Sequence, residues 1–217
     1  MSRPIITVDG VDGSGKSTFA ARLVAELAVA GGTPVLVRVD DFRRPLDWSA
    51  GNEAARYYEE YYDFERMGWL LRTFAAGGME LILPAFDGLA GVPLPDRRVV
   101  LGAQPVLVIE GVFVRRIPTG TIPVTAIYLD APEAVARARL VARDTARGRS
   151  RAEVERRLDQ RYVPGQRRYH LECTPRERAD LVVDNSDPIK ARLMHSSGRA
   201  APEIVRRALA SLLNPRP

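Results

Sequence analysis

The stretch Gly10-Val11-Asp12-Gly13-Ser14-Gly15-Lys16-Ser17 decides the fold of this chain. It fits the pattern of Gly, any four residues, Gly, Lys and then Ser or Thr. The apolar run 4–9 before it is typical of a buried strand, and the segment 15–30 after it has apolar residues at helical spacing. A strand, a glycine-rich turn and a helix N-terminus together turn backbone N–H groups inward and form a nest for anions. The sequence therefore predicts a phosphate-binding loop.

The loop also predicts its own chemistry. Lys16 is one of only two lysines in a chain whose basic residues are otherwise arginine, and a compact point charge suits the β- and γ-phosphates of ATP. The hydroxyl group of Ser17 is a ligand for Mg²⁺. ATP and Mg²⁺ are therefore the expected cofactors. The residues expected to contact the nucleotide are Gly10, Asp12, Gly13, Ser14, Gly15, Lys16, Ser17 and Thr18.

The rest of the chain alternates strand-like and helix-like segments, which favours an α/β fold with a parallel sheet. Further strands are expected at 34–39, 105–109, 124–129 and 180–183. Helices are expected at 52–76 with a break near Asp63, at 130–147, from 150 onward and at 202–213. Residues 80–104 suggest a β-hairpin insert, and residues 186–199 a loose polar segment. The whole chain, 1–217, is interpreted as one domain.

Two carboxylates follow expected strands. Asp40 comes after the second strand and Glu110 after the third, and ligands of open α/β sheets bind outside the carboxyl ends of the strands. A phosphotransferase needs one group to orient and deprotonate the acceptor hydroxyl and another near the metal ion. We assign Asp40 to the acceptor hydroxyl and Glu110, with Ser17, to Mg²⁺. Asp41 is the rival of Asp40, and spacing alone does not separate them.

An arginine-rich segment begins at Arg137. Arg143 and Arg147 are four apart and therefore share one face of a helix, and Arg149 follows the glycine at position 148. Phosphoryl transfer uses arginines on mobile elements to stabilise charge on the γ-phosphoryl oxygens. We predict a lid over about 137–165, with Arg143, Arg147 and Arg149 as catalytic residues beside Lys16 and Asp40.

Composition narrows the setting. The net charge of +5 and the pI of about 9.7 suit a protein that handles polyanionic nucleotides. No stretch approaches the roughly 20 apolar residues of a membrane helix, and no signal peptide is recognised. The single cysteine, Cys173, excludes an internal disulfide, so a cytoplasmic location is expected. The expected partner is a small-molecule acceptor, with no nucleic acid and no membrane. Whether the chain forms a homo-oligomer is left open.

Together these motifs resemble the uridine kinase branch of P-loop kinases, which includes phosphoribulokinase-like and pantothenate kinase-like members. The resemblance spans about residues 3–185. Its pieces are the phosphate loop, 39–42, 107–111, Arg143-Asp144 leading to 147–149, and 179–183. It implies a P-loop NTPase three-layer sandwich with a five-stranded parallel core. It also implies that Asp40 is the base, that Glu110 lies by the metal ion and that the three arginines belong to the lid.

The resemblance extends to the acceptor. Asp63 falls where these kinases place an aspartate for the ribose hydroxyls, and Phe86-Asp87 looks like the Tyr-Asp of the hairpin that packs on the base. Three positions depart from the pattern. No histidine lies between 80 and 104, Phe86 lacks the hydroxyl group of tyrosine, and Leu140 replaces an arginine usual on the lid helix. These departures weaken the expectation of uridine specificity and leave the expectation of phosphoryl transfer intact.

The predicted function is an ATP-dependent kinase for a hydroxyl group of a small molecule, with a uridine- or cytidine-like nucleoside as the first candidate. Nicotinamide riboside, pantothenate and sugar phosphates are the alternative acceptors. Among other classes, a GTPase requires an Asn-Lys-x-Asp motif that the chain lacks. A nucleic-acid-stimulated ATPase is a further alternative suggested by the pI. A thymidylate kinase shares the loop sequence but normally carries Asp-Arg, which is absent here in the expected context.

Overall fold

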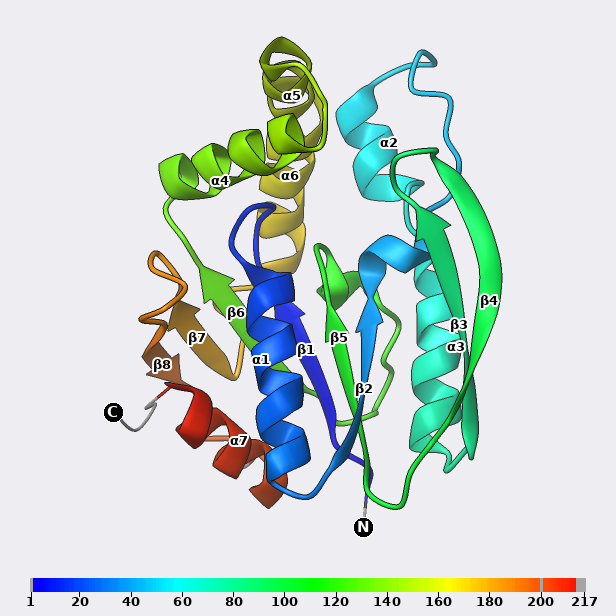
Figure 1. Cartoon of the computed structure of the whole chain (residues 1–217), viewed down its shortest axis with the longest axis vertical. Coiled ribbons are helices and arrows are strands. Elements are labelled where there is room, and N and C mark those ends of the chain that lie inside the picture. The colour runs from blue at the N-terminus through cyan, green and yellow to red at the C-terminus, as the bar shows by residue number, and fades with distance from the viewer. Residues whose placement is uncertain (1, 200, 214–217) are drawn as a thin grey trace.

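The computed structural model describes residues 2–199 and 201–213. A six-stranded sheet with the order β2-β5-β1-β6-β7-β8 forms its centre (Figure 1). Its strands are β1 (Ile5–Asp9), β2 (Thr33–Arg38), β5 (Pro105–Glu110), β6 (Thr125–Asp130), β7 (Leu181–Asp184) and β8 (Arg192–Ser196). The first five strands in that order are parallel, as the sequence predicts.

The sixth strand corrects the sequence-based prediction. Residues 186–199 were expected to be a loose polar segment, but β8 within them pairs antiparallel with β7, with Leu181 opposite Ser196. Every residue of β8 is exposed. An edge strand that buries no side chain shows no hydrophobic alternation, so the pairing is visible only in the folded chain.

The sheet is covered on both faces, as expected for a parallel sheet. The helices are α1 (Lys16–Val29), α2 (Glu53–Glu59), α3 (Phe64–Ala75), α4 (Glu133–Ala146), α5 (Arg151–Arg157), α6 (Val163–Cys173) and α7 (Glu203–Leu213). Short turns lie at η1 (Val39–Phe42), η2 (Val114–Arg116) and η3 (Leu158–Tyr162). Helices α1 and α7 pack on one face, and α3 packs on the other (Figure 1).

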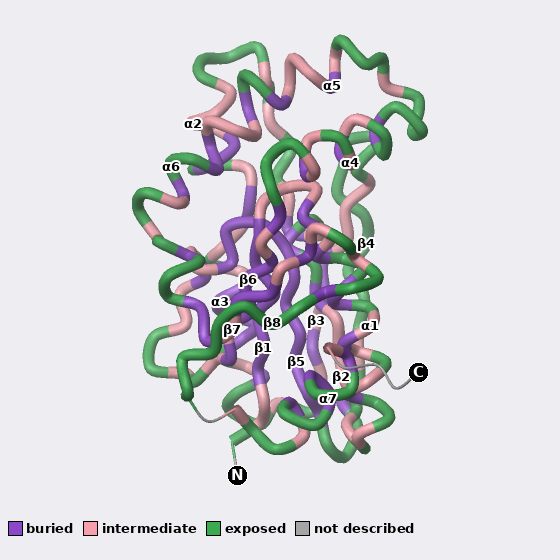
Figure 2. The backbone as a smooth tube through the Cα atoms, turned by 90° about the vertical axis from the view of Figure 1, so that its left-hand side faces the viewer, coloured by how far each residue is buried: buried purple, intermediate pink, exposed green. Residues whose placement is uncertain are grey.

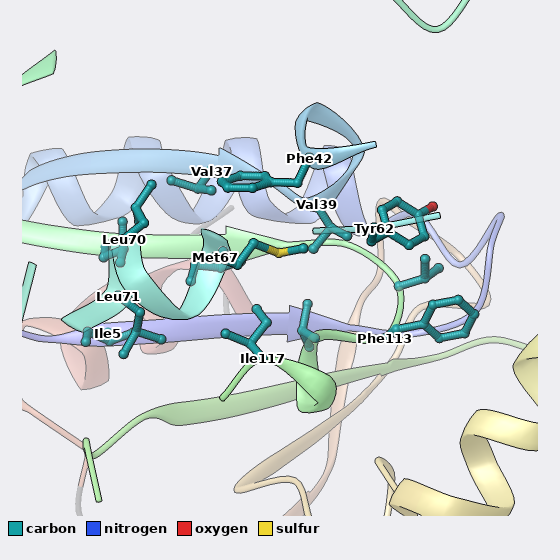
Figure 3. Packing of buried hydrophobic residues seen from close by; sticks show 14 of the residues in the cluster. Ile5, Val37, Val39, Phe42, Tyr62, Met67, Leu70, Leu71, Phe113 and Ile117 are labelled. Atoms are coloured by element: carbon teal, nitrogen blue, oxygen red, sulfur yellow. The ribbon is translucent and has the colours of Figure 1, made fainter. Parts of the chain in front are cut away.

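Alternating residues of the central strands feed two cores. In β1, Ile5 joins the cluster that contains α3, while Ile6 and Val8 join the cluster that contains α1 and α7. Figure 3 shows Met67 of α3 beside β5 and Leu71 of α3 over β1 in the first cluster. The buried backbone concentrates along the central strands, whereas the region around α5 is mostly exposed or intermediate (Figure 2). The three-layer arrangement leaves the carboxyl ends of the strands free for a site.

Local signals in the sequence place several boundaries. The break in the helix at 52–76 falls at Asp63, whose carboxylate accepts a hydrogen bond from Arg66 N and caps α3. Ser150 caps α5 in the same way through Glu153 N. The predicted insert is a hairpin of β3 (Glu80–Asp87) and β4 (Val92–Val100). The helix predicted from 150 onward is formed by α5, a π turn, η3, and α6, and it ends at Cys173.

Candidate active site

The phosphate loop joins β1 to α1 beneath α4 (Figure 1). Two glycines are required there by close approaches. A Cβ at Gly13 would lie 2.1 Å from the carbonyl oxygen of Ala136 in α4, and one at Gly15 would lie 2.4 Å from Asn185 Nδ2. Both residues also have positive φ angles, of 83° and 93°. The loop is therefore shaped against α4 and against the residue that follows β7.

Lys16 is the first residue of α1, and its side chain lies across the loop. The ammonium group donates hydrogen bonds to the carbonyl oxygens of Gly10 at 3.0 Å and Val11 at 2.8 Å. The first backbone N–H groups of a helix have no hydrogen-bond partner within the helix, and those of α1 lie at the end of the phosphate loop. The hydroxyl oxygen of Ser14 is buried and has no hydrogen-bond partner among the described residues. These donors together form a cradle for the phosphates of a nucleotide.

Ser17 and Glu110 lie together as the sequence predicts for a metal site. The Ser17 hydroxyl donates a hydrogen bond at 3.0 Å to Oε1 of Glu110, the last residue of β5. Burial raises the pKa of Glu110 above its ordinary value, against the opposing charge of Lys16. In the described part of the chain no cluster of three or more His, Cys, Asp or Glu residues could hold a metal ion alone. Two oxygen donors beside a phosphate cradle fit Mg²⁺, which usually takes few protein ligands and shares phosphate oxygens.

Asp40 lies in η1, just past β2, and its environment differs from that of Asp41. The Asp40 carboxylate is 2.5 Å from Nη2 of Arg43 and accepts a hydrogen bond from the Tyr62 hydroxyl at 3.4 Å. Its side chain is 55% exposed and lines a cavity above the strand ends, whereas Asp41 does not line that cavity. Burial raises the pKa of Asp41 despite the neighbouring Arg38. Of these two carboxylates, only Asp40 lines the cavity.

The cavity has a volume of about 860 Å³ and is enclosed by three parts of the chain. The phosphate loop contributes Asp12, and the arginine-rich segment contributes Arg143, Arg147 and Arg149. A third group of lining residues, called the acceptor side below, comprises Asp40, Arg43, Trp48, Tyr57, Tyr61, Tyr62, Phe86 and Asp87. The predicted base, the predicted lid arginines and the predicted hairpin aromatic residue thus share one cavity. Its size suits a small molecule.

A buried carboxylate, Asp144, organises the arginine-rich segment. Its two oxygens lie 2.8 Å from Arg143 Nε and 3.1 Å from Arg149 Nη1, and its side chain is 4% exposed. Arg147 ends α4, is exposed, and makes no side-chain hydrogen bond or ion pair with other described residues. Two of the three predicted lid arginines are therefore held in place, while the third is free to reach into the cavity.

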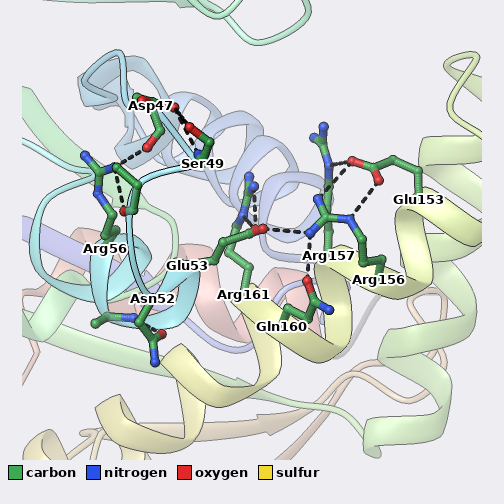
Figure 4. A network of polar contacts seen from close by, with 12 residues as sticks. Asp47, Ser49, Asn52, Glu53, Arg56, Glu153, Arg156, Arg157, Gln160 and Arg161 are labelled. Atoms are coloured by element: carbon green, nitrogen blue, oxygen red, sulfur yellow. Dashed lines mark hydrogen bonds and ion pairs between the residues drawn. The ribbon is translucent and has the colours of Figure 1, made fainter.

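A network of ion pairs ties the arginine-rich segment to α2 (Figure 4). Glu53 of α2 is 2.6 Å from Arg156 and 2.7 Å from Arg161, and Glu153 holds Arg156 and Arg157. The guanidinium group of Arg161 also stacks 3.4 Å from the ring centre of Trp48. Arg157 and Arg161 line the cavity, so the network forms the wall between the predicted lid and the acceptor side.

Asp63 lies outside this cavity. Its carboxylate caps α3 and lies 3.1 Å from Nη2 of Arg44. Its predicted contact with ribose hydroxyls therefore requires a rearrangement of that ion pair, and the contact stays a prediction. Phe86, by contrast, lines the cavity at the hairpin, next to Asp87, whose carboxylate accepts hydrogen bonds from Leu89 N and Ala90 N in the turn.

Several residues of the site were not predicted from the sequence. Asn185 follows β7 and donates to the Ser14 carbonyl at 2.6 Å, so the strand-end rule that selected Asp40 would also have selected it. Arg43 directly follows the predicted motif 39–42, and Asp144 belongs to the predicted motif Arg143-Asp144, but its pairing with two arginines was not predicted. Gln166 gives no signal of its own, because only the folded α6 brings it to the loop, where its amide donates to Asp12 Oδ2 at 2.8 Å.

The geometry above agrees with a match to a family model. Residues 5–186 match the model described as the phosphoribulokinase / uridine kinase family. The chain belongs to this family. The match covers the loop, both strand-end carboxylates, the hairpin and the arginine-rich segment, so membership rests on the whole site as well as on the loop. The predicted resemblance to this branch of P-loop kinases is thereby confirmed.

Two solved structures share this fold. A protein proposed to be a uridine kinase from Bacillus stearothermophilus is 24% identical, with a TM-score of 0.64 over 84% of this chain and 89% of that one. A protein proposed to be a fructose transport system kinase from Silicibacter sp. TM1040 is also 24% identical, with a TM-score of 0.66 over 78% and 85%. At this identity the likeness confirms the P-loop kinase fold and leaves the acceptor unassigned.

No match to the chain was found among curated proteins. In the described residues no helix has both the length and the apolar character needed to cross a membrane.

Proposed function

We propose that the chain is an ATP-dependent kinase that transfers the γ-phosphoryl group to a hydroxyl group of a small molecule. One observation carries the proposal: Asp40, Asp12 of the phosphate loop and the arginines at 143, 147 and 149 line a single cavity. Phosphoryl transfer mainly requires that donor, acceptor and stabilising charges be held together, and a shared cavity lined by these residues supports such an arrangement. Family membership supports the same reaction class.

In this proposal each part of the site has a role. The loop and Lys16 hold the phosphates of ATP, and Asp40 accepts the proton of the acceptor hydroxyl. The hydroxyl oxygen then bonds to the γ-phosphorus, the bond to the bridging oxygen breaks, and its electron pair leaves with ADP. Arg143, Arg147 and Arg149 stabilise the charge on the transferred group. Ser17 and Glu110 would hold Mg²⁺, which supplies charge neutralisation on the phosphates.

The acceptor is the open part of the proposal. The rings of Trp48, Tyr61 and Phe86 line the cavity and could stack on a base, which supports a nucleoside as the first candidate. Nicotinamide riboside, pantothenate and sugar phosphates remain alternatives. A nucleic-acid substrate and a membrane partner are not part of the proposal, and a cytoplasmic setting remains an expectation.

Two substitutions test the assignment. We expect Lys16→Ala to remove measurable phosphotransfer because the phosphates lose their central positive charge. We expect Asp40→Asn to lower kcat by about 100-fold or more while ATP still binds, since general-base catalysis typically contributes that much. The measurements are ADP release with a panel of acceptors and equilibrium binding of ATP. Asp41→Asn serves as the matched control, and a near-normal kcat in Asp40→Asn would show that the base is another residue.

A further inference from the structure

Arg43 is a cavity residue that none of the roles above employs. Its backbone is fixed, because residue 43 forms an isolated β-bridge with Tyr62. On either side of it, Arg44 N donates to the Tyr61 carbonyl at 2.8 Å and Asp63 N donates to the Phe42 carbonyl at 2.9 Å. The start of α3 therefore holds the segment that carries both Asp40 and Arg43. The fold therefore fixes where the backbone of Arg43 lies.

The side chain of Arg43 is largely buried, yet one of its donor atoms lacks a hydrogen-bond partner among the described residues. Its side chain is 21% exposed, and its central carbon lies 5.6 Å from the ring centre of Tyr61. Gly88 of the hairpin turn leaves room for it, since a Cβ there would lie 2.9 Å from Arg43 Nη1. Nε is buried and has no hydrogen-bond partner among the described residues. A guanidinium group has five N–H donors, and leaving one buried and unpaired is costly.

The other carboxylates of the cavity already bind other groups of the protein, so they are not partners of Arg43. Asp12 accepts hydrogen bonds from Tyr57 and Gln166, Asp87 accepts them from turn amides, and Asp144 holds two arginines. Among the described residues, Arg43 forms an ion pair with one carboxylate, that of Asp40, the proposed base. While Arg43 Nη2 lies 2.5 Å from Asp40 Oδ2, that carboxylate oxygen is engaged and is not available to a hydroxyl group of the acceptor. A second anion bound to Arg43 would draw its guanidinium group away from Asp40 and leave this oxygen open to the acceptor.

We propose that the acceptor carries a carboxylate or phosphate group, in addition to its reacting hydroxyl, and that Arg43 binds this group. A guanidinium group matches either anion with paired hydrogen bonds. Binding would satisfy the buried donors of Arg43 and free Asp40 for the hydroxyl proton. The inference rests on the proposed function and narrows it: among the open acceptors it favours those with a negative charge over neutral nucleosides.

The test compares pairs of acceptors in which one member carries an anionic group and the other lacks it. Pantothenate is paired with panthenol, ribose 5-phosphate is paired with ribose, and uridine is a further neutral acceptor. We expect wild-type protein to use a charged member of at least one pair with a kcat/KM about tenfold or more above its neutral partner. Arg43→Met should erase that preference by raising the KM of the charged acceptor about 10- to 100-fold, with the KM of ATP little changed. The pair that responds distinguishes a carboxylate from a phosphate.

Arg44→Met is the matched control. Arg44 is the adjacent arginine, pairs with Asp63 and does not line the cavity, so its loss should leave the preference for charge unchanged. Arg43→Lys, which keeps the charge but loses the planar fork, should retain the preference with weaker affinity. It serves as the second variant where Arg43→Met does not fold.

Calorimetric titration of the same pairs into protein saturated with Mg²⁺ and a non-hydrolysable ATP analogue separates the two proposals. Absence of phosphotransfer to every acceptor would count against the proposed function. Tighter binding of a charged member, lost in Arg43→Met, would still support the role of Arg43. Equal or better use and binding of the neutral members by wild-type protein, or a preference that persists in Arg43→Met, would overturn the inference.

Discussion

At the scale of single residues, buried charge gathers around Lys16. Asp9 and Glu110 end the neighbouring strands β1 and β5, and each is about 5% exposed. Asp9 accepts hydrogen bonds from Gly10 N at 2.7 Å and from the Tyr169 hydroxyl at 2.5 Å. Burial nonetheless raises the pKa of Asp9 from 3.8 to about 6, because these bonds and Lys16 only partly offset the loss of water.

This shift predicts a pH dependence of stability. The folded state holds the Asp9 proton more tightly than the unfolded state does. The stabilising contribution is therefore fully present below about pH 4 and is lost as pH rises through about 6. Asp9→Asn keeps the shape and removes the titration. The free energy of unfolding of the variant, relative to wild type, should rise by about 1–3 kcal/mol between pH 4 and pH 7.5, as measured by urea denaturation. A difference that stays constant with pH would show that Asp9 is ionised when buried.

At the scale of elements, the segment from α4 to α5 combines a fixed part with a free part. Asp144 holds Arg143 and Arg149 from within the segment, so their guanidinium groups are positioned by the fold. Arg147 is at the bend between the two helices and lacks such a partner among the described residues. The predicted lid therefore has one arginine that is able to respond to a developing charge without first breaking an ion pair.

Arg147→Ala should accordingly lower kcat more than it weakens ATP binding. The expected loss is at least about tenfold in kcat, since an arginine that contacts the transferred group acts mainly in the transition state. The measurement compares turnover with the dissociation constant of ATP. Arg151→Ala is the matched control, because Arg151 is an exposed arginine of α5 that pairs with Glu155 and does not line the cavity. Equal losses in turnover and binding would indicate a ground-state contact instead.

At the scale of the whole molecule, Asp12 connects three parts of the chain. Its carboxylate accepts hydrogen bonds from Tyr57 of α2 and from Gln166 of α6, both at 2.8 Å. Its backbone N–H donates to the Gln166 side chain at 3.3 Å. The phosphate loop is thereby joined to the acceptor side and to the long helical segment that carries the arginines. Asp12 thus links the phosphate loop directly to both α2 and α6.

Gln166→Leu should weaken this connection without touching any reacting group. We expect the KM of ATP to rise several-fold and the free energy of unfolding to fall by about 1–2 kcal/mol, because the loop loses two hydrogen bonds. Tyr128→Phe is the control: it removes the hydrogen bond between Tyr128 and His170 of the same helix, which does not touch the loop. If both variants changed the KM of ATP equally, Gln166 would act only through the packing of α6.

Hydrophobic periodicity and local sequence rules determined the secondary structure and the phosphate loop of this protein. The phosphate loop, the five parallel strands, the hairpin and the caps at Asp63 and Ser150 depend on neighbouring residues, so each was predictable from a short window. The strand-end rule also predicted that Asp40 and Glu110 would lie at the loop edge of the sheet. Edge strand β8 was not predictable, since it buries no side chain.

Tertiary structure alone decided which side chains meet across long distances in the chain. It brought Gln166 to Asp12, Glu53 to Arg161 and Asn185 to Ser14, and it turned Asp63 toward Arg44 and away from the cavity. It also placed Arg43 on Asp40, where spacing could not tell a cavity arginine from a surface one. Such pairings depend on the packing of whole elements, which no local pattern specifies. The phosphate loop was therefore predictable from the sequence, whereas the arrangement of residues around the cavity was decided by the packing of distant elements.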